Sequence, residues 1–129
     1  FIDKKRNIPY YLNQYDIIIK SYQKDGIGLN WNDFRSGNNS GYCAMQLAIL
    51  MGYKNIHFIG IDLKITGKET HFHGGYGEQD ELFKNKLNRY YSTFNAGLRE
   101  IKEKRIRVNI YSCSKKSRLN EIIPYKEFI

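Results

Sequence analysis

The chain has 129 residues and a formal net charge of +8, with 41% hydrophobic and 26% charged residues. This length fits a single domain, and the composition is ordinary for a soluble globular protein. An aromatic content of 15% argues against a chain that is disordered throughout. No apolar run approaches the roughly 20 residues of a membrane span. Because residue 1 is Phe and no signal-peptide pattern opens the chain, we expect a piece of a longer protein.

Cysteine content and charge distribution further limit the class of protein and the kind of partner. Cys43 and Cys113 are too few for a disulfide scaffold, so we expect two buried or partly buried thiols in a reducing compartment, and hence a cytoplasmic protein. Residues 84–126 hold 12 Lys or Arg and 3 Asp or Glu. Such a basic stretch favours anionic partners, although solvated lysines on a helix would give the same composition.

The first half of the chain predicts a strand, a loop, a helix and a second strand. Residues 15–20 form a short apolar run typical of a buried strand, and residues 23–39 are rich in loop formers. Asn and Ser at 38–40 are preferred N-caps for an apolar helix over 42–51, which Gly52 would end. Residues 55–61 predict the next buried strand.

The second half predicts one long helix between a glycine-rich loop and a last strand. Residues 63–77 contain four glycines, and from Glu78 apolar side chains recur every three to four residues as far as Ile101. A strand follows at 107–111, and then a polar loop or short helix at 113–120. This alternation predicts an α/β fold with three layers, in which 15–20, 55–61 and 107–111 belong to one parallel sheet.

The start of the first helix is the first candidate site. The N–H groups at a helix N-terminus can bind a phosphate or carboxylate, with Gly41 allowing close approach and Ser40 donating a hydroxyl. A plain N-cap formed by Asn39 or Ser40 is the simpler interpretation.

Two histidines in the glycine-rich loop form the second candidate. His71 and His73 are suited to take a proton from a sugar hydroxyl or from water. Asp62, directly after the strand 55–61, could bind a ribose hydroxyl, orient a histidine or cap a loop. A zinc or iron site would use both histidines with Asp62, but the spacing is weak evidence for a metal, and we predict none. We expect His57, inside an apolar strand, to be structural.

The loop after the last strand is a third candidate. Residues 112–118 read Ser-Cys-Ser-Lys-Lys-Ser-Arg, a composition that suits an anion site as well as a solvated turn. Walker, nucleophile-elbow and G-x-G-x-x-G motifs are absent from the sequence.

Three blocks of sequence together indicate a family. They are Ser40-Gly41, Ala44, Ala48, Gly52-Tyr53-Lys54, Ile56 and Gly60-Ile61-Asp62; then Thr70-His71-Phe72-His73-Gly74; and then Val108-Asn109-Ile110-Tyr111-Ser112-Cys113 with Ser117 and Leu119. Over roughly residues 26–124 the chain resembles bacterial lipooligosaccharide sialyltransferases and their uncharacterised phage-encoded relatives, and residues 37–41 are closer to the phage version.

The resemblance implies a Rossmann-like fold, the C-terminal part of a glycosyltransferase, and a nucleotide sugar as donor substrate with no separate cofactor. Asn39, Ser40, Gly41 and Gly60 would bind the donor, and His73 or His71 would deprotonate the hydroxyl of a glycan acceptor. Inverting transfer of this kind needs no metal.

Two other functions remain open at this stage. Only residues 63–69 fill the place of the family's lid, which leaves a non-catalytic nucleotide-binding or anion-binding module as the alternative. Nucleic-acid binding through 84–126 is a weaker candidate because no nucleic-acid motif is present. A homo-oligomer is compatible with the sequence.

Overall fold

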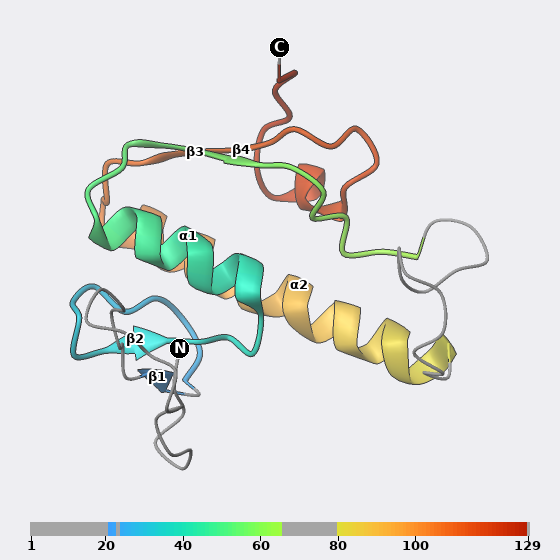
Figure 1. The fold of residues 1–129 in the computed structure, drawn as a ribbon, viewed down its shortest axis with the longest axis horizontal. Coiled ribbons are helices and arrows are strands. Elements are labelled where there is room, and N and C mark those ends of the chain that lie inside the picture. Colours follow the sequence, from blue (N-terminus) through green and yellow to red (C-terminus); the bar gives the residue numbers. More distant parts are fainter. Residues whose placement is uncertain (1–20, 23, 66–79, 129) are drawn as a thin grey trace, which may run out of the picture.

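A computed structural model describes residues 21–22, 24–65 and 80–128. Its elements follow in the order β1 (Ser21–Tyr22), β2 (Phe34–Arg35), α1 (Ser40–Leu50), β3 (Asn55–Phe58), α2 (Asp80–Glu103), β4 (Asn109–Ser112) and a 3-10 turn (Arg118–Glu121). Figure 1 shows α1 between the strand pair β3–β4 and the strand pair β1–β2. The predicted strand 15–20 lies outside the described residues.

The central strand pair is parallel, as the sequence predicts. In its register Asn55 is opposite Asn109 and Phe58 is opposite Ser112. Tyr125 continues the sheet on the other side of β4, because the Ser112 N–H donates to the Pro124 carbonyl at 3.0 Å and the Ser112 carbonyl accepts from the Lys126 N–H at 2.9 Å. β1 and β2 form a separate parallel pair.

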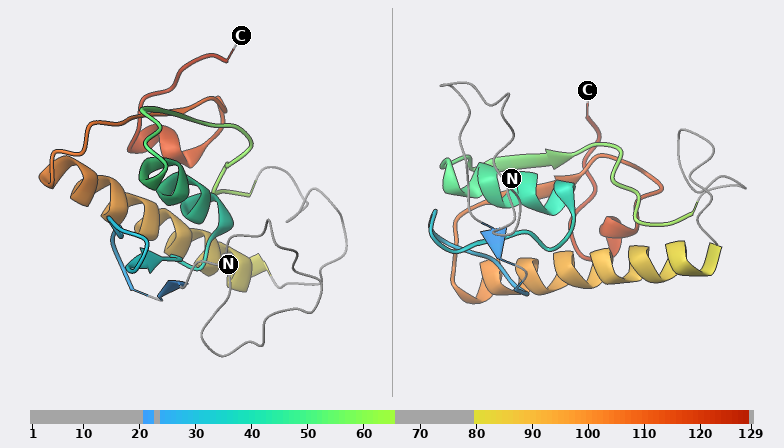
Figure 2. Two further views of the ribbon diagram at one scale, coloured as in Figure 1. Left: turned by 60° about the vertical axis from the view of Figure 1, so that its left-hand side comes forward. Right: turned by 60° about the horizontal axis from the view of Figure 1, so that its bottom comes forward.

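The two helices in the described part of the chain cover the same face of β3–β4 (Figure 2). Ile56, Phe58 and Ile110 point toward the helices and are buried in the core. The alternating residues on the other face are exposed or half-buried. The molecule is therefore a mixed α/β structure with a small parallel sheet. Helices on the second face, which the three-layer fold requires, stay a prediction.

Local signals set the bounds of α1. The Asn39 side chain accepts a hydrogen bond from the Tyr42 N–H at 2.9 Å, so Asn39 is the N-cap. At the other end the N–H groups of Gly52 and Tyr53 donate to the carbonyls of Ile49 and Ala48. Gly52 has a φ of 86°, which completes a Schellman motif. The helix begins two residues before its predicted start and ends at Leu50, one residue before its predicted end, with Gly52 directly after the C-cap Met51.

The predicted apolar stripe of α2 faces the core. Phe83, Phe94 and Ile101 are buried there, at the spacing of one helical face. Leu82, which the pattern also assigned to the stripe, is 63% exposed because it lies beside this face. The helix is described from Asp80, and its predicted first residues lie outside the described residues.

Tyr42 joins both helices to the loop before β2. Its side chain is fully buried, its ring meets the Phe94 ring edge-on at 5.4 Å, and its hydroxyl donates to the Gly26 carbonyl at 2.6 Å. Gly97 of α2 faces the Tyr42 ring, and a Cβ there would lie 2.8 Å from Cε2 of Tyr42. The close packing of α1 on α2 thus depends on a glycine.

A second buried polar side chain attaches the same loop. Gln46 of α1 accepts a hydrogen bond from the Gly28 N–H at 2.7 Å and donates to the Arg35 carbonyl at 3.2 Å. Glu100 of α2 accepts from the Ile27 N–H at 3.2 Å. The segment 24–36 is rich in glycine and polar residues, and these hydrogen bonds fix it against both helices.

Replacing Gly97 by Ala should destabilise the protein by about 1–3 kcal/mol, because the buried Tyr42 ring cannot move away from the added methyl group. Urea denaturation measures this free energy of unfolding. Asn95→Ala, on the exposed side of α2, is the control and should stay within about 0.5 kcal/mol of the parent. A gain of about 1 kcal/mol in Gly97→Ala, as for an ordinary helical glycine, would contradict the contact.

Tyr42 should also make stability depend on alkaline pH. Burial, with the nearby Glu100 carboxylate, raises the pKa of the Tyr42 hydroxyl. Above about pH 10 the unfolded chain loses this proton while the folded chain keeps it, so stability falls as pH rises. Free energies of unfolding from urea denaturation between about pH 8 and 11 should fall more steeply for the parent than for Tyr42→Phe, by up to about 1.4 kcal/mol per pH unit. Equal slopes would show that Tyr42 titrates normally.

Candidate functional site

The start of α1 and the end of β3 meet at one edge of the sheet, because α1 runs antiparallel to the strand that follows it (Figure 1). Binding sites in parallel sheets lie outside this carboxyl edge. A groove of about 400 Å³ opens here, and we call it the helix-start groove. Its lining residues are Asn38, Asn39, Ser40, Gly41, Gly60, Ile61, Asp62, Leu63, Phe83, Leu87 and Tyr90.

The structure brings together the five sequence-predicted site residues that it describes. Asn39, Ser40 and Gly41 come from the start of α1, and Gly60 and Asp62 come from the loop after β3. The two segments are some twenty residues apart in the chain, and only the packing of α1 on the sheet makes them neighbours. His71 and His73 lie outside the described residues.

The loop after β3 is held by the loop after β4. The Gly60 N–H donates to Oγ of Ser114 at 2.9 Å, Oγ of Ser117 donates to the Ile61 carbonyl at 2.6 Å, and the Arg118 N–H donates to the Asp62 carbonyl at 2.8 Å.

Leu63, the next residue, has a φ of 52° although it is not glycine. Such a conformation costs on the order of 1–3 kcal/mol and persists where the surroundings enforce it. Burial of the Leu63 side chain in the core supplies that constraint. The loop therefore has one fixed path, which holds Asp62 in the wall of the groove.

The backbone at the start of α1 offers hydrogen-bond donors to the groove. The Asn39 side chain accepts a hydrogen bond from the Tyr42 N–H. The N–H groups of Ser40 and Gly41 belong to the first turn of the helix, where backbone N–H groups have no acceptor within the helix. The helix dipole adds a partial positive charge at this end. Ser40 is exposed, so its hydroxyl is accessible. The arrangement suits an anionic oxygen.

The structure gives Gly41 a packing role that the sequence did not indicate. A Cβ on Gly41 would meet Cδ1 of Ile61, and it would also lie 3.2 Å from Oδ1 of Asn39. The space beside this glycine is thus filled by the chain itself, rather than kept open for a ligand.

A basic pocket adjoins the helix-start groove and shares Leu63 and Leu87 with it. It encloses about 300 Å³ and is lined by Leu63, Lys64, Ile65, Lys84, Leu87, Asn88 and Arg118. The Arg118 guanidinium lies 4.0 Å from the centre of the Tyr91 ring and donates to Oδ1 of Asn88 at 2.6 Å. Three cations from separate parts of the chain therefore line one pocket.

Sequence reasoning found this basic pocket only in part. Arg118 belongs to the loop 112–118, which the sequence singled out as a candidate anion site. Lys64 and Lys84 were missed, because nothing in the sequence places a residue of the glycine-rich loop beside the first turns of α2. A general signal was present in the basic composition of 84–126.

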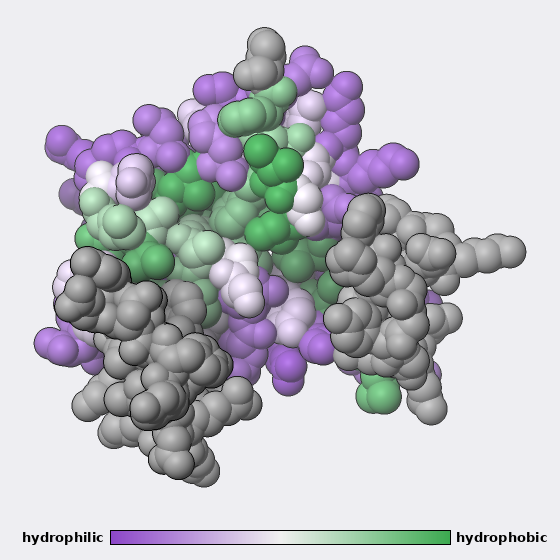
Figure 3. All heavy atoms as spheres, in the orientation of Figure 1, coloured by the Kyte–Doolittle hydropathy of each residue, from purple (hydrophilic) through white to green (hydrophobic). Residues whose placement is uncertain are grey.

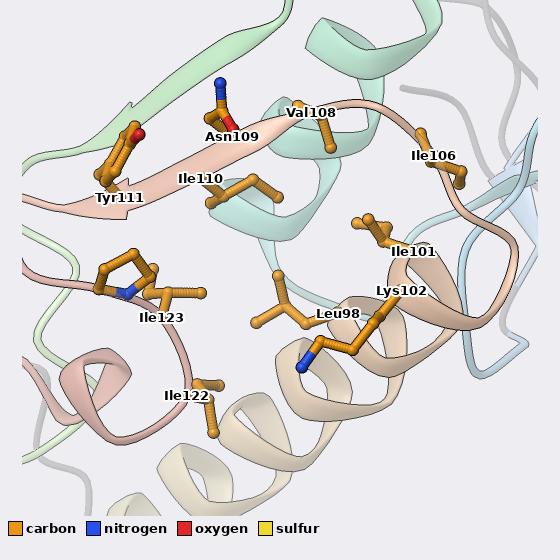
Figure 4. A pocket seen from close by; sticks show the side chains of 11 residues that line it. Leu98, Ile101, Lys102, Ile106, Val108, Asn109, Ile110, Tyr111, Ile122 and Ile123 are labelled. Carbon is orange, nitrogen blue, oxygen red and sulfur yellow. The ribbon is translucent and has the colours of Figure 1, made fainter.

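Another pocket, of about 350 Å³, lies between α2, β4 and the segment 122–124. Figure 4 shows Leu98, Ile110 and Ile123 converging on it, with Lys102 at its margin. Most of its lining is aliphatic, with Lys102, Asn109 and Tyr111 as the polar members, and no His, Cys, Asp or Glu is among the lining residues. Figure 3 shows further apolar surface over the area of α1 and β3, surrounded by hydrophilic side chains.

His57 is not a core residue. It is half-buried on the face of the sheet opposite the helices, where its ring stacks on Tyr111 with centres 5.2 Å apart. Its Nδ1 lies 3.6 Å from Sγ of Cys113. As expected, both thiols are free, with Cys43 buried and Cys113 half-buried. Within 24–65 and 80–128, no three His, Cys, Asp or Glu side chains come together as metal ligands.

No family model, curated protein or solved structure matches this chain. The helices in the described part of the chain are too short or too polar to span a membrane.

The contact between Gly41 and Ile61 can be measured with a double-mutant cycle. Gly41→Ala adds a methyl group against Cδ1 of Ile61, and Ile61→Val removes that atom. Alanine otherwise stabilises a helix by about 1 kcal/mol relative to glycine. The change in the free energy of unfolding caused by Gly41→Ala should therefore be at least about 0.5 kcal/mol more favourable in the Ile61→Val background than in the parent. Urea denaturation of the four proteins gives this value. Additive effects would mean that the two side chains do not meet.

Proposed function

We propose that this chain is a sialyltransferase-like glycosyltransferase domain that binds a nucleotide-activated sugar in the helix-start groove and the basic pocket. One observation supports this most. The residues expected to bind the donor, Asn39, Ser40, Gly41 and Gly60, line one groove together with Asp62. The adjoining basic pocket supports an anionic ligand in particular, because a nucleotide sugar is negatively charged.

In this proposal each part of the site binds a different part of the donor. The N–H groups and hydroxyl at the start of α1 would bind a phosphate oxygen, and the Asp62 carboxylate would accept from a ribose or sugar hydroxyl. Phe83 and Tyr90 would supply an apolar wall for a flat base or a sugar face. Lys64, Lys84 and Arg118 would bind a second phosphate or a sugar carboxylate.

Transfer would proceed by direct displacement. The hydroxyl oxygen of a glycan acceptor would attack the anomeric carbon, the nucleotide phosphate would leave, and an imidazole would take the hydroxyl proton. We assign this base to His73, with His71 as the second choice, because their loop follows directly from Asp62. Hydroxyls and backbone N–H groups would stabilise the leaving phosphate without a metal ion.

A non-catalytic nucleotide-binding module is the second candidate. The short segment 63–69 favours it, because these residues alone fill the place of the family's lid. Among the described lining residues of the helix-start groove, the ionisable ones are Asp62 and Tyr90. The two candidates share the binding site and differ in turnover.

A nucleotide titration followed by NMR tests the shared binding site. Cytidine and uridine nucleotides should shift the backbone amides of residues 39–42 and 60–63. The double variant Lys64→Ala/Lys84→Ala should weaken binding about tenfold, since two charge contacts are worth on the order of 1.4 kcal/mol together.

The matched control is Lys54→Ala/Arg107→Ala. It removes the same charge from a separate pocket lined by Lys54 and Arg107, next to the first residues of β3 and β4. This control should bind as the parent does. No amide shift at millimolar nucleotide, or equal losses in the two double variants, would contradict the proposed site.

Turnover separates the two candidates. With a pool of nucleotide sugars, His73→Ala should abolish transfer and donor hydrolysis while nucleotide binding stays at the parental level. If the parent binds nucleotide but consumes no donor with any acceptor, the chain is a binding module.

A further inference from the structure

The face of the sheet opposite the helices carries a thiol and an imidazole in contact. Sγ of Cys113 lies 3.6 Å from Nδ1 of His57, and both residues are half-buried, within reach of solvent. We propose that Cys113 is a reactive thiol that exchanges with small-molecule disulfides, and that His57 is the base that activates it. This site is independent of the helix-start groove.

The sheet fixes both members of the pair. The register places His57 of β3 opposite Tyr111 of β4, two residues before Cys113. The Cys113 N–H donates to the Phe58 carbonyl at 2.8 Å, which continues the ladder and keeps the cysteine beside β3. Tyr111 stacks on the imidazole, and the Phe128 ring meets it edge-on at 6.1 Å. The contact is therefore made by two constrained side chains.

Charged groups of both signs lie on the segments beside the pair. Nζ of Lys126, from the segment beside β4, lies 4.9 Å from the centre of the Tyr111 ring. Lys115, two residues after the cysteine, forms an ion pair with Glu127 at 3.7 Å. Asn55 and Asn109 on the same face are neutral and hydrogen-bond to each other at 3.0 Å. The group in contact with the thiol is therefore the imidazole, which can accept its proton.

Cys43 provides a reference within the same chain. It is 6% exposed, its thiol donates to the Ser36 carbonyl at 3.2 Å, and burial raises the pKa of this thiol. Cys43 should therefore stay a neutral, unreactive thiol in the folded protein.

The exchange step needs no further reactant. The proton of the Cys113 thiol passes to Nδ1 of His57, and the thiolate attacks one sulfur of the disulfide. The S–S bond of the reagent breaks, its other half leaves as a thiolate, and a mixed disulfide forms on Cys113. Cys113 is oxidised and the leaving sulfur is reduced, so the electrons balance. A second thiol reverses the reaction.

The rate of reaction with dithiobis(nitrobenzoic acid), followed by its coloured thiolate product, tests the proposal. Cys43→Ser and Cys113→Ser assign the signal to each thiol. At about pH 6.5, Cys113 should react at least about tenfold faster than a peptide of residues 110–116. His57→Phe keeps a ring to stack on Tyr111 but removes the base, and should lower the rate about tenfold. Tyr111→Phe keeps the stack and the base, and should react as the parent does.

Two results would overturn the proposal. One is a Cys113 rate equal to that of the peptide. The other is an unchanged rate in a His57→Phe protein whose circular dichroism matches the parent. If His57→Phe does not fold, His57→Asn decides instead, because it also removes the imidazole and keeps a polar side chain at this half-buried position. A rate in that variant equal to the rate of the parent would refute the pairing.

Discussion

The architecture depends on Tyr42, which takes part in three contacts at once. Its N–H closes the cap with Asn39, its ring packs on Phe94 in α2, and its hydroxyl binds the Gly26 carbonyl. The start of α1 is therefore fixed to the second helix and to the loop before β2. Because that helix start also forms one wall of the helix-start groove, the geometry of the candidate site is set by a core residue that does not line the groove.

The opposite wall of the groove depends on small side chains from another loop. Ser114, Ser117 and the backbone of Arg118 bind three successive residues after β3. The basic pocket begins at the same loop, because the Arg118 side chain lines it. The basic pocket and the path of residues 60–63 are consequently linked through a few hydrogen bonds, each worth about 1 kcal/mol.

Features that depend on neighbouring residues could be predicted from the sequence. The capped helix, the amphipathic helix, and two parallel strands with a groove at their carboxyl edge follow from local propensity and periodicity. What could not be predicted depends on distant contacts. The apolar neighbours of His57 do not show on which face of the sheet it lies, and the two-residue strands β1 and β2 leave too short a pattern to detect. The packing role of Gly41 and the basic pocket could not be predicted either. The sequence does not show that Ile61 lies against the start of α1, or that Lys64 lies near the first turns of α2.

The parallel ladder also determines when the groove can exist. β3 and β4 pair residues 54 positions apart, so the sheet closes late, after the chain between them has formed its long helix. On the ribosome, α1 and β3 emerge long before the serines that hold the loop after β3. Until residues 109–118 arrive, an apolar helix and an unpaired strand are exposed together, which is the stage at which such a nascent chain is most open to aggregation.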